Sequence, residues 1–364
     1  MINYRSDVAV IVLTRNAGTL WKTWIDAIKK QTITVGKYLV VDSSSEDDTA
    51  QLAKQAGFDL ITIPAELFDH GGTRQFAAQL CPDAEYLIYL TQDAILKQRD
   101  SLAKMLAVFN KNKKIAQVYG RHIPRPEADF LEKYARQFTY PAESEMRDYR
   151  DVQKRGFKAA FSSDVYAAYR AEALRSIGGF PKKILVSEDS YVSARLLQAN
   201  WKIYYCAESK VEHSHDYSSW QLFQRYFDIG VFHCNEQALF KKIGKPDSEG
   251  LRFLISQLYY VVKHRPILLA KAIINIAIKY VAFKIGRYYR LLPSYLWQKI
   301  SAQKAYWRPQ KVDNIPMVIW DNQPLEKLLT PFMSNKRALN SQYIVNKKSL
   351  QITQNTNDCV TEKP

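Results

Sequence analysis

Three short clusters of acidic and imidazole side chains have the residue types needed to bind a metal ion and to move a proton. Thr91-Gln92-Asp93 ends an apolar run, Ser187-Glu188-Asp189 opens a helical pattern, and His213-Ser214-His215 follows another apolar stretch. Carboxylates can bind a hard cation that also carries phosphate oxygens, and a positioned carboxylate can take a proton from a hydroxyl. Together the clusters could hold a divalent cation, a diphosphate and a sugar acceptor.

The candidate metal ligands are Asp93, His213 and His215. One aspartate at the end of a strand is enough for Mg²⁺ or Mn²⁺ when phosphate oxygens and water complete the shell. His213 and His215 alternate, so on an extended segment both side chains lie on one face. One could complete the metal shell with Asp93 while the other contacts a diphosphate. Taken singly, Asp93 could also be a solvated turn residue, and single histidines are more often structural.

The candidate catalytic residues are Glu188 and Asp189, at the start of a predicted helix. The helix N-terminus keeps a carboxylate there ionised, which suits a general base. The neighbouring acid would point elsewhere, toward an acceptor hydroxyl or an internal basic group. Acid pairs at helix starts are also ordinary capping residues, so the alternative of a purely structural pair stays open.

Two further features could bind a nucleotide or its phosphates. Asp42 follows a buried strand, and in open α/β sheets ligands bind beyond the carboxyl ends of the strands; the alternative is a turn or capping residue. In Asp69-His70-Gly71-Gly72-Thr73-Arg74, the glycines allow close backbone approach and Arg74 could reach an anion at a helix start. The alternative for that segment is a tight turn with a surface arginine.

Strands and helices alternate in the first 120 residues, which positions these side chains. Helical patterns cover Trp21–Gln31 and about Asp47–Gln55, between apolar strand-like runs. The four strand-like runs are Val8–Leu13, Tyr38–Asp42, Leu60–Ile63 and Tyr86–Leu90. This alternation predicts βαβ units and an α/β fold with a mostly parallel, doubly wound sheet.

The pattern changes along the chain and predicts three regions. Residues 1–235 would form the catalytic domain, with a donor half at about 1–120 and an acceptor half at about 121–235. Residues 236–308 are basic, aromatic and mostly helical in pattern. Residues 309–364 are polar with little periodicity, so we expect a poorly ordered tail.

The charge of +16 is concentrated near the C-terminal side. Residues 240–308 contain fourteen Lys and Arg against Asp247 and Glu249, a local net charge of +12. Such an excess favours a polyanionic neighbour, either nucleic acid or an anionic membrane. No nucleic-acid-binding module is recognisable, which favours the membrane. A helical subdomain with solvated charges is the compatible alternative.

Targeting features of the sequence favour the cytoplasm. The four cysteines are far apart, which argues against a disulfide framework and indicates a reducing compartment. The first residues lack an apolar signal core. No stretch of about 18 residues is free of charge, as a membrane span would require. We therefore expect a cytoplasmic protein, peripheral on the inner face of the cell membrane.

Read in order, several motifs resemble the inverting, GT-A-fold family 2 glycosyltransferases. These are Val10-Ile11-Val12-Leu13-Thr14-Arg15-Asn16, Val41-Asp42-Ser43-Ser44-Ser45-Glu46, Thr91-Gln92-Asp93, and Gly179-Phe180-Pro181 followed by Glu188-Asp189 and Arg195. Thr91 stands where the family's Asp-x-Asp metal motif has its first aspartate, which leaves Asp93 as the surviving ligand. The resemblance implies that Asp189 is the base. It also implies donor binding by Thr14, Arg15, Asn16, Asp42, Arg74, Gln92 and Asp93.

Within that family, Phe68–Arg74 and His213–Ser218 look most like bacterial rhamnosyltransferases that use dTDP-β-L-rhamnose. The resemblance implies inverting transfer to a hydroxyl of a glycan or a lipid-diphosphate-linked acceptor in cell-surface polysaccharide synthesis. Two alternatives remain: a family member that uses a UDP-sugar, and a catalytically weak, non-enzymatic partner in a glycan-assembly complex.

Overall fold

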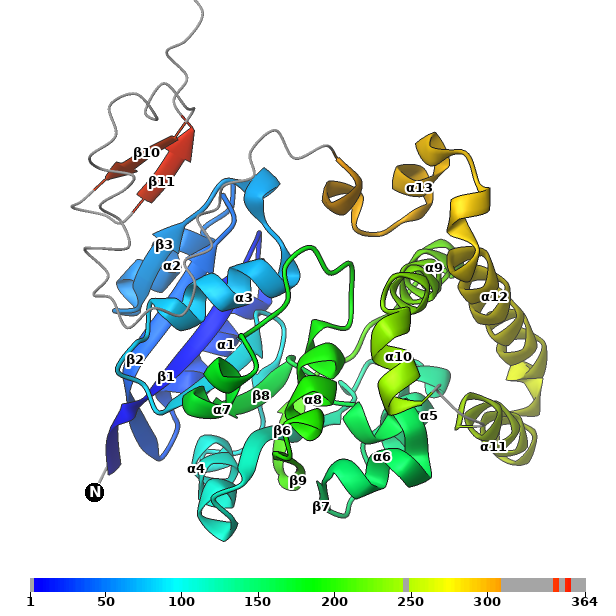
Figure 1. Cartoon of the computed structure of the whole chain (residues 1–364), viewed down its shortest axis with the longest axis horizontal. Coiled ribbons are helices and arrows are strands. Elements are labelled where there is room, and N and C mark those ends of the chain that lie inside the picture. Colours follow the sequence, from blue (N-terminus) through cyan, green and yellow to red (C-terminus); the bar gives the residue numbers. More distant parts are fainter. Residues whose placement is uncertain (1–2, 245–248, 309–342, 347–350, 355–364) are drawn as a thin grey trace, which may run out of the picture.

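The computed structural model describes residues 3–244, 249–308, 343–346 and 351–354 (Figure 1). One mixed sheet forms its centre, with strand order β10-β11-β3-β2-β1-β4-β8-β6-β9-β5 and with β7 beside β9. The strands are β1 (Asn3–Thr14), β2 (Ile33–Asp42), β3 (Asp59–Thr62), β4 (Tyr86–Thr91), β5 (Ile95–Leu96), β6 (Ile115–Ile123), β7 (Glu145–Arg147), β8 (Tyr166–Arg170), β9 (Lys202–Glu212), β10 (Tyr343–Asn346) and β11 (Gln351–Gln354).

The first four strands run parallel, as the alternating pattern predicts. Strand β8 then runs antiparallel between β4 and β6, and β9 lies parallel to β6. The predicted α/β fold with flanking helices and a helical C-terminal region is confirmed. The antiparallel position of β8 is a detail that the local pattern did not specify, because its partners are far away in the sequence.

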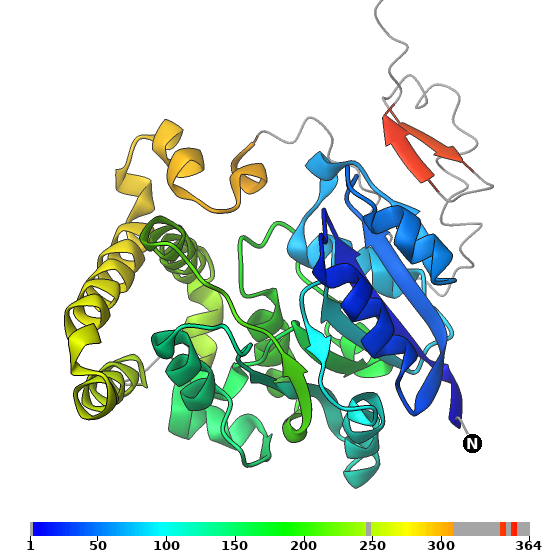
Figure 2. The same ribbon diagram turned by 180° about the vertical axis from the view of Figure 1, so that it is seen from behind.

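Helices cover both faces of the sheet (Figures 1 and 2). They are α1 (Leu20–Lys29), α2 (Thr49–Gln55), α3 (His70–Gln79), α4 (Ser101–Ala107), α5 (Phe130–Thr139), α6 (Tyr149–Arg155), α7 (Ala171–Ser176), α8 (Glu188–Gln198), α9 (Ser219–Asn235), α10 (Gln237–Ile243), α11 (Glu249–His264), α12 (Leu269–Arg287) and α13 (Ser294–Ile300). Short 3₁₀ turns are η1 (Ala65–Leu67), η2 (Val108–Lys111), η3 (Gly156–Ala160), η4 (Pro266–Leu268), η5 (Tyr289–Leu291) and η6 (Lys304–Trp307).

The central part of β1 is a continuous apolar run because the strand is buried on both faces. Val8, Val10 and Val12 pack into one hydrophobic core with α1 and α4, while Ala9 and Ile11 pack into the opposite core with α3 and α8. Side chains alternate between the faces of a strand, so a strand buried on both faces needs apolar residues at every position. The two cores fix the carboxyl end of β1, which carries Thr14.

Helices α9 and α12 pack side by side at the edge of the molecule, where their backbones meet at two glycines. A Cβ atom added at Gly230 would lie 2.3 Å from the Phe283 carbonyl oxygen, and one at Gly286 would lie 2.1 Å from the Phe227 carbonyl oxygen. Only glycine leaves room for this approach. The C-terminal helical region is therefore tied to α9, which lies within the predicted catalytic domain.

One described helix, covering Pro266–Arg287, is long and apolar enough to cross a membrane by length and composition alone. It has a mean hydropathy of 1.7, and Lys271 and Lys279 lie inside its apolar stretch. Only 11% of that stretch is buried in the protein. The apolar surface of α12 is thus mostly open to the surroundings.

The predicted domain limits remain predictions. The central sheet continues across the expected boundary near residue 120. Strand β6 spans residues 115–123 and so crosses the expected boundary between donor and acceptor halves. The expectation of a poorly ordered tail over 309–364 lies mostly outside the described residues. Within that range, β10 and β11 pair with each other, and β11 adjoins β3.

Candidate active site

The carboxyl ends of β1 and β2 bring two of the predicted donor-binding residues together. Thr14 and Asp42 are aligned in the sheet, and the Thr14 hydroxyl donates to Asp42 Oδ1 at 2.9 Å. The Ser45 backbone N–H donates to Asp42 Oδ2 at 2.8 Å, and the Ser45 hydroxyl donates to Asp42 Oδ1 at 2.5 Å. Asp42 is 1% exposed, so its carboxylate holds the serine-rich turn in place at this edge of the sheet.

Three more of the predicted donor-binding residues, Arg15, Asn16 and Gln92, lie in the loops at the same edge of the sheet. The Gln92 side chain accepts from the Arg15 backbone N–H at 2.8 Å and donates to the Arg15 carbonyl at 3.1 Å. Asn16, at φ 47°, accepts from the Glu46 backbone N–H at 2.8 Å. These bonds join the loops that follow β1, β2 and β4 into one edge. The Arg15 side chain is exposed there.

The three predicted metal ligands come together. Asp93, His213 and His215 each offer a ligand atom, and these atoms lie within 4.8 Å of one another. His213 Nε2 is 3.3 Å from Asp93 Oδ2. The His213 and His215 rings meet edge to face at 4.4 Å between centroids. A carboxylate with two imidazoles at this spacing fits a divalent first-row metal ion.

Neighbouring residues hold these ligands in place. The Thr91 hydroxyl donates to Asp93 Oδ1 at 2.7 Å, so the residue that replaces the first acid of the metal motif orients the remaining one. Arg125 donates to the Asp93 carbonyl at 2.7 Å and to the Ser214 carbonyl at 3.4 Å. Outer partners of this kind fix ligand geometry.

Electrostatics keeps the ligand set ready to bind a cation. Burial alone would raise the pKa of Asp93, but the hydrogen bond and charge of His213, together with Thr91, hold it well below its usual range. Burial and the neighbouring His213 lower the pKa of His215 to about 3. At neutral pH the cluster therefore presents one carboxylate and neutral imidazole nitrogens, which are the forms that ligate metals.

The second cluster surrounds the start of α8. Arg74, on α3, lies between two carboxylates: its Nη1 is 2.9 Å from Glu188 Oε1 and its Nε is 3.1 Å from Asp164 Oδ2. The Arg74 side chain is 8% exposed. Asp189 is half-buried, and its Oδ2 accepts from the Asp164 backbone N–H at 3.3 Å. Glu188 thus faces an internal basic group, one of the two partners expected for it, while Asp189 keeps access to solvent.

The carboxylates of this cluster have separated protonation states. Burial raises the pKa of Asp164 to about 8, although Arg74 acts against it. Burial also acts on Glu188, but the charges of Arg74 and His70 lower its pKa below the ordinary value. Burial and the charge of Glu188 raise the pKa of Asp189 to about 6. At pH 7 Arg74 therefore pairs with ionised Glu188, Asp164 is protonated, and Asp189 is an available base.

Three residues near these clusters had no distinguishing signal in the sequence. Asp164 precedes β8 without a motif, and Arg125 follows β6 in a charge-mixed stretch. Arg225, on α9, lies 5.8 Å from the Tyr217 ring centroid, and its charge reaches Glu188 and Asp189. Because Tyr217 stacks on His215, Arg225 lies between the metal-ligand cluster and the predicted base. Only the folded arrangement brings these residues to the site.

Comparison with known proteins identifies the family. Residues 9–178 match the model of glycosyl transferase family 2. The O-antigen chain rhamnosyltransferase WbaN of Salmonella anatum is 38% identical over 299 residues, which cover 82% of this chain and 95% of the relative. RfbN of Salmonella typhimurium, also an O-antigen chain rhamnosyltransferase, is 37% identical over 301 residues, covering 82% and 96%. The chain belongs to glycosyl transferase family 2. The predicted family and glycosyltransferase activity are confirmed.

Solved structures resemble this glycosyltransferase more distantly. A mannosyltransferase from Pyrobaculum calidifontis, in complex with GDP-Man and Mn²⁺, is 18% identical with a TM-score of 0.48, covering 84% of this chain and 85% of that one. TarS 1-349 of S. aureus, in complex with UDP-GlcNAc, is 14% identical with a TM-score of 0.45, covering 78% and 92%.

Proposed function

We propose that this glycosyltransferase transfers L-rhamnose from dTDP-β-L-rhamnose to a hydroxyl of a glycan or lipid-linked acceptor in bacterial cell-surface polysaccharide synthesis. The observation that carries the proposal is the similarity to two O-antigen chain rhamnosyltransferases along nearly their whole length. The structure supports it with residues of the required chemistry: the half-buried carboxylate of Asp189 at the start of α8, and the carboxylate–imidazole cluster of Asp93, His213 and His215.

Asp189 acts as the general base in this proposal. It takes the proton of the acceptor hydroxyl as the acceptor oxygen forms a bond to C1 of the donor, and the bond from C1 to the diphosphate oxygen breaks. The electron pair of that bond leaves with dTDP. Attack on the opposite face of C1 makes an α-rhamnoside from the β-linked donor. A positioned base with a pKa near the working pH suits this step.

The other site residues bind or orient. Thr14, Arg15, Asn16, Asp42 and Gln92 are the proposed nucleotide side, because their hydrogen bonds build one rim at the ends of β1, β2 and β4. Asp93, His213 and His215 would hold Mg²⁺ or Mn²⁺, whose chemistry is to neutralise charge on the departing diphosphate.

Arg74 and Glu188 support the base in this scheme. Arg74 was predicted to bind the donor, and its contacts add a second role. Because Arg74 pairs with Glu188, the Glu188 carboxylate is not available as the base, and Asp189 takes that role in the proposal. Glu188, proposed with Asp189 as a catalytic residue, then acts through its charge, which raises the pKa of Asp189.

We also propose that the enzyme works at the cytoplasmic membrane surface through α11 and α12. Apolar side chains are exposed at the helical spacing of one face on each helix. They are Leu251, Ile255, Tyr259 and Val262 on α11, and Ile273, Ile274, Tyr280 and Val281 on α12. Exposed Lys263, Arg265, Lys284 and Arg287 lie among them. Apolar area with basic residues suits the interface of an anionic bilayer.

The contacts of α12 favour a helix that lies on the membrane rather than one that crosses it. Its inner side packs against α9 through Gly230 and Gly286. Lys271 pairs with Asp129 at 2.9 Å, and Lys279 Nζ lies 5.4 Å from the Phe253 ring centroid. Both lysines inside the apolar stretch are thus held by the rest of the protein, which leaves the outer face apolar.

The donor is tested by nucleotide-sugar turnover. The wild-type enzyme is incubated with Mn²⁺ and separately with dTDP-L-rhamnose, UDP-glucose and GDP-mannose, and release of the nucleoside diphosphate is measured. We expect turnover of dTDP-L-rhamnose, suppressed by EDTA. Preference for UDP-glucose would keep the glycosyltransferase and reject rhamnose as the donor sugar. Turnover of none of them would contradict the proposed reaction.

A further inference from the structure

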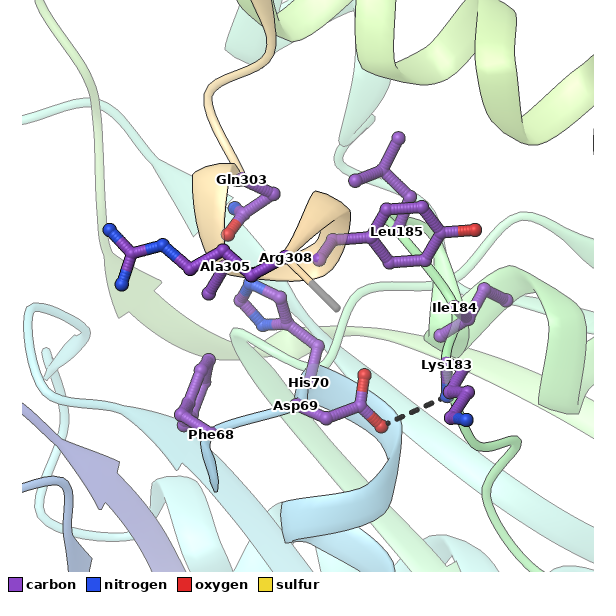
Figure 3. Close-up of a pocket in the computed structure, with 10 residues that line it drawn as sticks. Phe68, Asp69, His70, Lys183, Ile184, Leu185, Gln303, Ala305 and Arg308 are labelled. Carbon is purple, nitrogen blue, oxygen red and sulfur yellow. Dashed lines mark hydrogen bonds between the residues drawn. The ribbon is translucent and has the colours of Figure 1, made fainter. Parts of the chain in front are cut away.

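A cavity of about 320 Å³ lies between three segments that are far apart in the sequence (Figure 3). Its floor is Phe68, Asp69 and His70, just before and at the start of α3. One wall is Lys183–Leu185, in the loop that precedes α8. The third side is formed by residues of the chain after α13. The volume is at the lower end of the range that is typical for small-molecule sites.

The third side of this cavity is built from the C-terminal segment 303–308, which contributes Gln303, Ala305, Tyr306 and Arg308. This segment is anchored on α9. The Ala302 backbone N–H donates to Asp228 Oδ2 at 3.0 Å, and Asn235 donates to the Tyr306 hydroxyl at 3.4 Å. The basic helical region therefore returns to the catalytic domain and completes a cavity there.

The cavity adjoins the catalytic carboxylates through His70. His70 Nδ1 is 3.9 Å from Glu188 Oε1, and Figure 3 shows the His70 ring directed toward Gln303 and Ala305. Glu188 is the immediate neighbour of Asp189 in α8. A molecule in the cavity would thus lie near the start of α8, on the side of Glu188.

The cavity has polar groups suited to hydroxyls and apolar groups suited to ring carbons. Asp69 Oδ2 accepts from the backbone N–H groups of Gly72 at 2.6 Å and Lys183 at 3.2 Å. These bonds fix the carboxylate, which is directed toward the cavity (Figure 3). The Gln303 amide lies on the third side of the cavity, toward which the His70 ring is directed (Figure 3). Carboxylate, amide and imidazole groups can each bond neutral hydroxyls.

We propose that this cavity is the subsite for the sugar unit of the acceptor, and that the C-terminal segment 303–308 forms its third side. The inference rests on the proposed function and adds the class of molecule bound: a pyranose held through its hydroxyls and ring carbons, near the start of the helix that carries Asp189. Phe68, Ile184 and Leu185 provide apolar contact for the sugar ring. The C-terminal helical region then has two roles, at the membrane and at the acceptor.

Two alanines of the same segment allow a matched test. Ala305 lines the cavity and Ala302 does not, and both side chains are exposed. Ala305→Trp should fill the cavity, while Ala302→Trp adds the same bulk outside it. Gln303→Leu removes the amide at similar size. The probes are methyl glycosides of galactose, glucose, mannose and rhamnose, measured by saturation-transfer NMR with dTDP and Mg²⁺ present.

We expect at least one glycoside to bind the wild type and the Ala302→Trp variant alike. Binding should weaken roughly tenfold or more in Ala305→Trp and Gln303→Leu, the factor expected for the loss of one or two hydrogen bonds and their contacts. Hydrolysis of dTDP-L-rhamnose by water needs no acceptor, so it should be the same in Ala302→Trp as in the wild type and should remain detectable in Ala305→Trp and Gln303→Leu.

Three results would overturn the inference. The first is that the wild type binds no glycoside, and the second is that Ala305→Trp binds glycosides as the wild type does. The third is loss of donor hydrolysis in Ala305→Trp alone, which would indicate that the cavity binds the donor. Absence of donor hydrolysis in the wild type would instead contradict the proposed function. Glycoside binding is measured separately from donor turnover, so the two failures can be distinguished.

Discussion

Asp93 depends on its neighbours because it is the single acid of its motif. Thr91 donates to one carboxylate oxygen and His213 lies 3.3 Å from the other. Two imidazoles thus accompany the carboxylate in the candidate ligand set, where the resembled family has a second aspartate. We infer that the histidine pair would compensate for the change at Thr91.

The metal site can be tested by Mn²⁺ binding, followed as the loss of the free-ion signal in electron paramagnetic resonance. Asp93→Asn should remove detectable binding because it replaces the charged ligand. Thr91→Val should weaken binding roughly 10- to 100-fold, as expected for a residue that orients a ligand. Wild-type affinity in Asp93→Asn would exclude this cluster as the metal site.

The buried carboxyl group of Asp164 can be tested by two substitutions. Because burial raises its pKa to about 8, it is protonated at pH 7, and asparagine resembles that protonated form. Asp164→Asn should keep turnover within a few-fold at pH 7, whereas Asp164→Leu should lose most of it, since Tyr169 and Arg74 lose their partner. Equal turnover in both variants would show that Asp164 does not support the site.

The candidate site residues could be chosen from local sequence and remain predictions, whereas the residues that contact them could not be chosen in this way. Asp93, His213, His215 and Asp189 lie in short motifs or at pattern changes. Asp164, Arg125 and Arg225 act through contacts between segments distant in the sequence, and a single sequence contains no local sign of them. The sequence also did not predict the hydrogen bonds of the Asp42 carboxylate, which accepts from the Thr14 and Ser45 hydroxyls.

At the level of the elements, apolar periodicity predicted the four parallel strands because each contains an apolar run that ends at a turn. It did not predict β8 between β4 and β6, because antiparallel pairing there depends on long-range contacts. Nor did it predict how α9 and α12 pack. That contact depends on the absence of a side chain at Gly230 and Gly286.

The contact between α9 and α12 makes a prediction about stability. Gly286→Ala should lower the free energy of unfolding by about 1–3 kcal/mol, because the added methyl group overlaps the Phe227 carbonyl and the helices must separate. Gly250→Ala is the control, since a Cβ there meets nothing within 4 Å and alanine favours a helix. Equal melting temperatures for Gly286→Ala and the wild type would contradict the close packing.

Across the whole molecule, the exposed apolar and basic side chains of α11 and α12 lie away from the central sheet. The helices α11 and α12 form the edge farthest from the N-terminus, on the right of Figure 1. Composition predicted the basic excess there, but not the side that it covers. In the fold, Asp129 pairs with Lys271 and the Phe253 ring lies near Lys279, while Lys263, Arg265, Lys284 and Arg287 are exposed beside the apolar side chains.

Membrane association is tested by flotation with vesicles of phosphatidylglycerol and phosphatidylcholine. The wild type should float with the anionic vesicles at low salt and less at high salt, because screening weakens the attraction. A double change, Ile273→Glu with Ile274→Glu, should prevent flotation. Tyr4→Glu alters an equally exposed apolar residue at the opposite end and should have no effect. Flotation of the double variant at the wild-type level would reject this surface.

The Asp189→Asn variant tests whether Asp189 is the general base. Binding of dTDP-L-rhamnose and transfer to acceptor are measured for the variant and the wild type from pH 5 to 8. Wild-type turnover should fall as the pH drops through about 6, where Asp189 becomes protonated.

Asp189→Asn should bind the donor as the wild type does and transfer about 10²- to 10⁴-fold more slowly at every pH, the range expected when a general base is removed. Near-normal transfer by Asp189→Asn with normal donor binding would contradict the account, because the hydroxyl proton would then leave by another route.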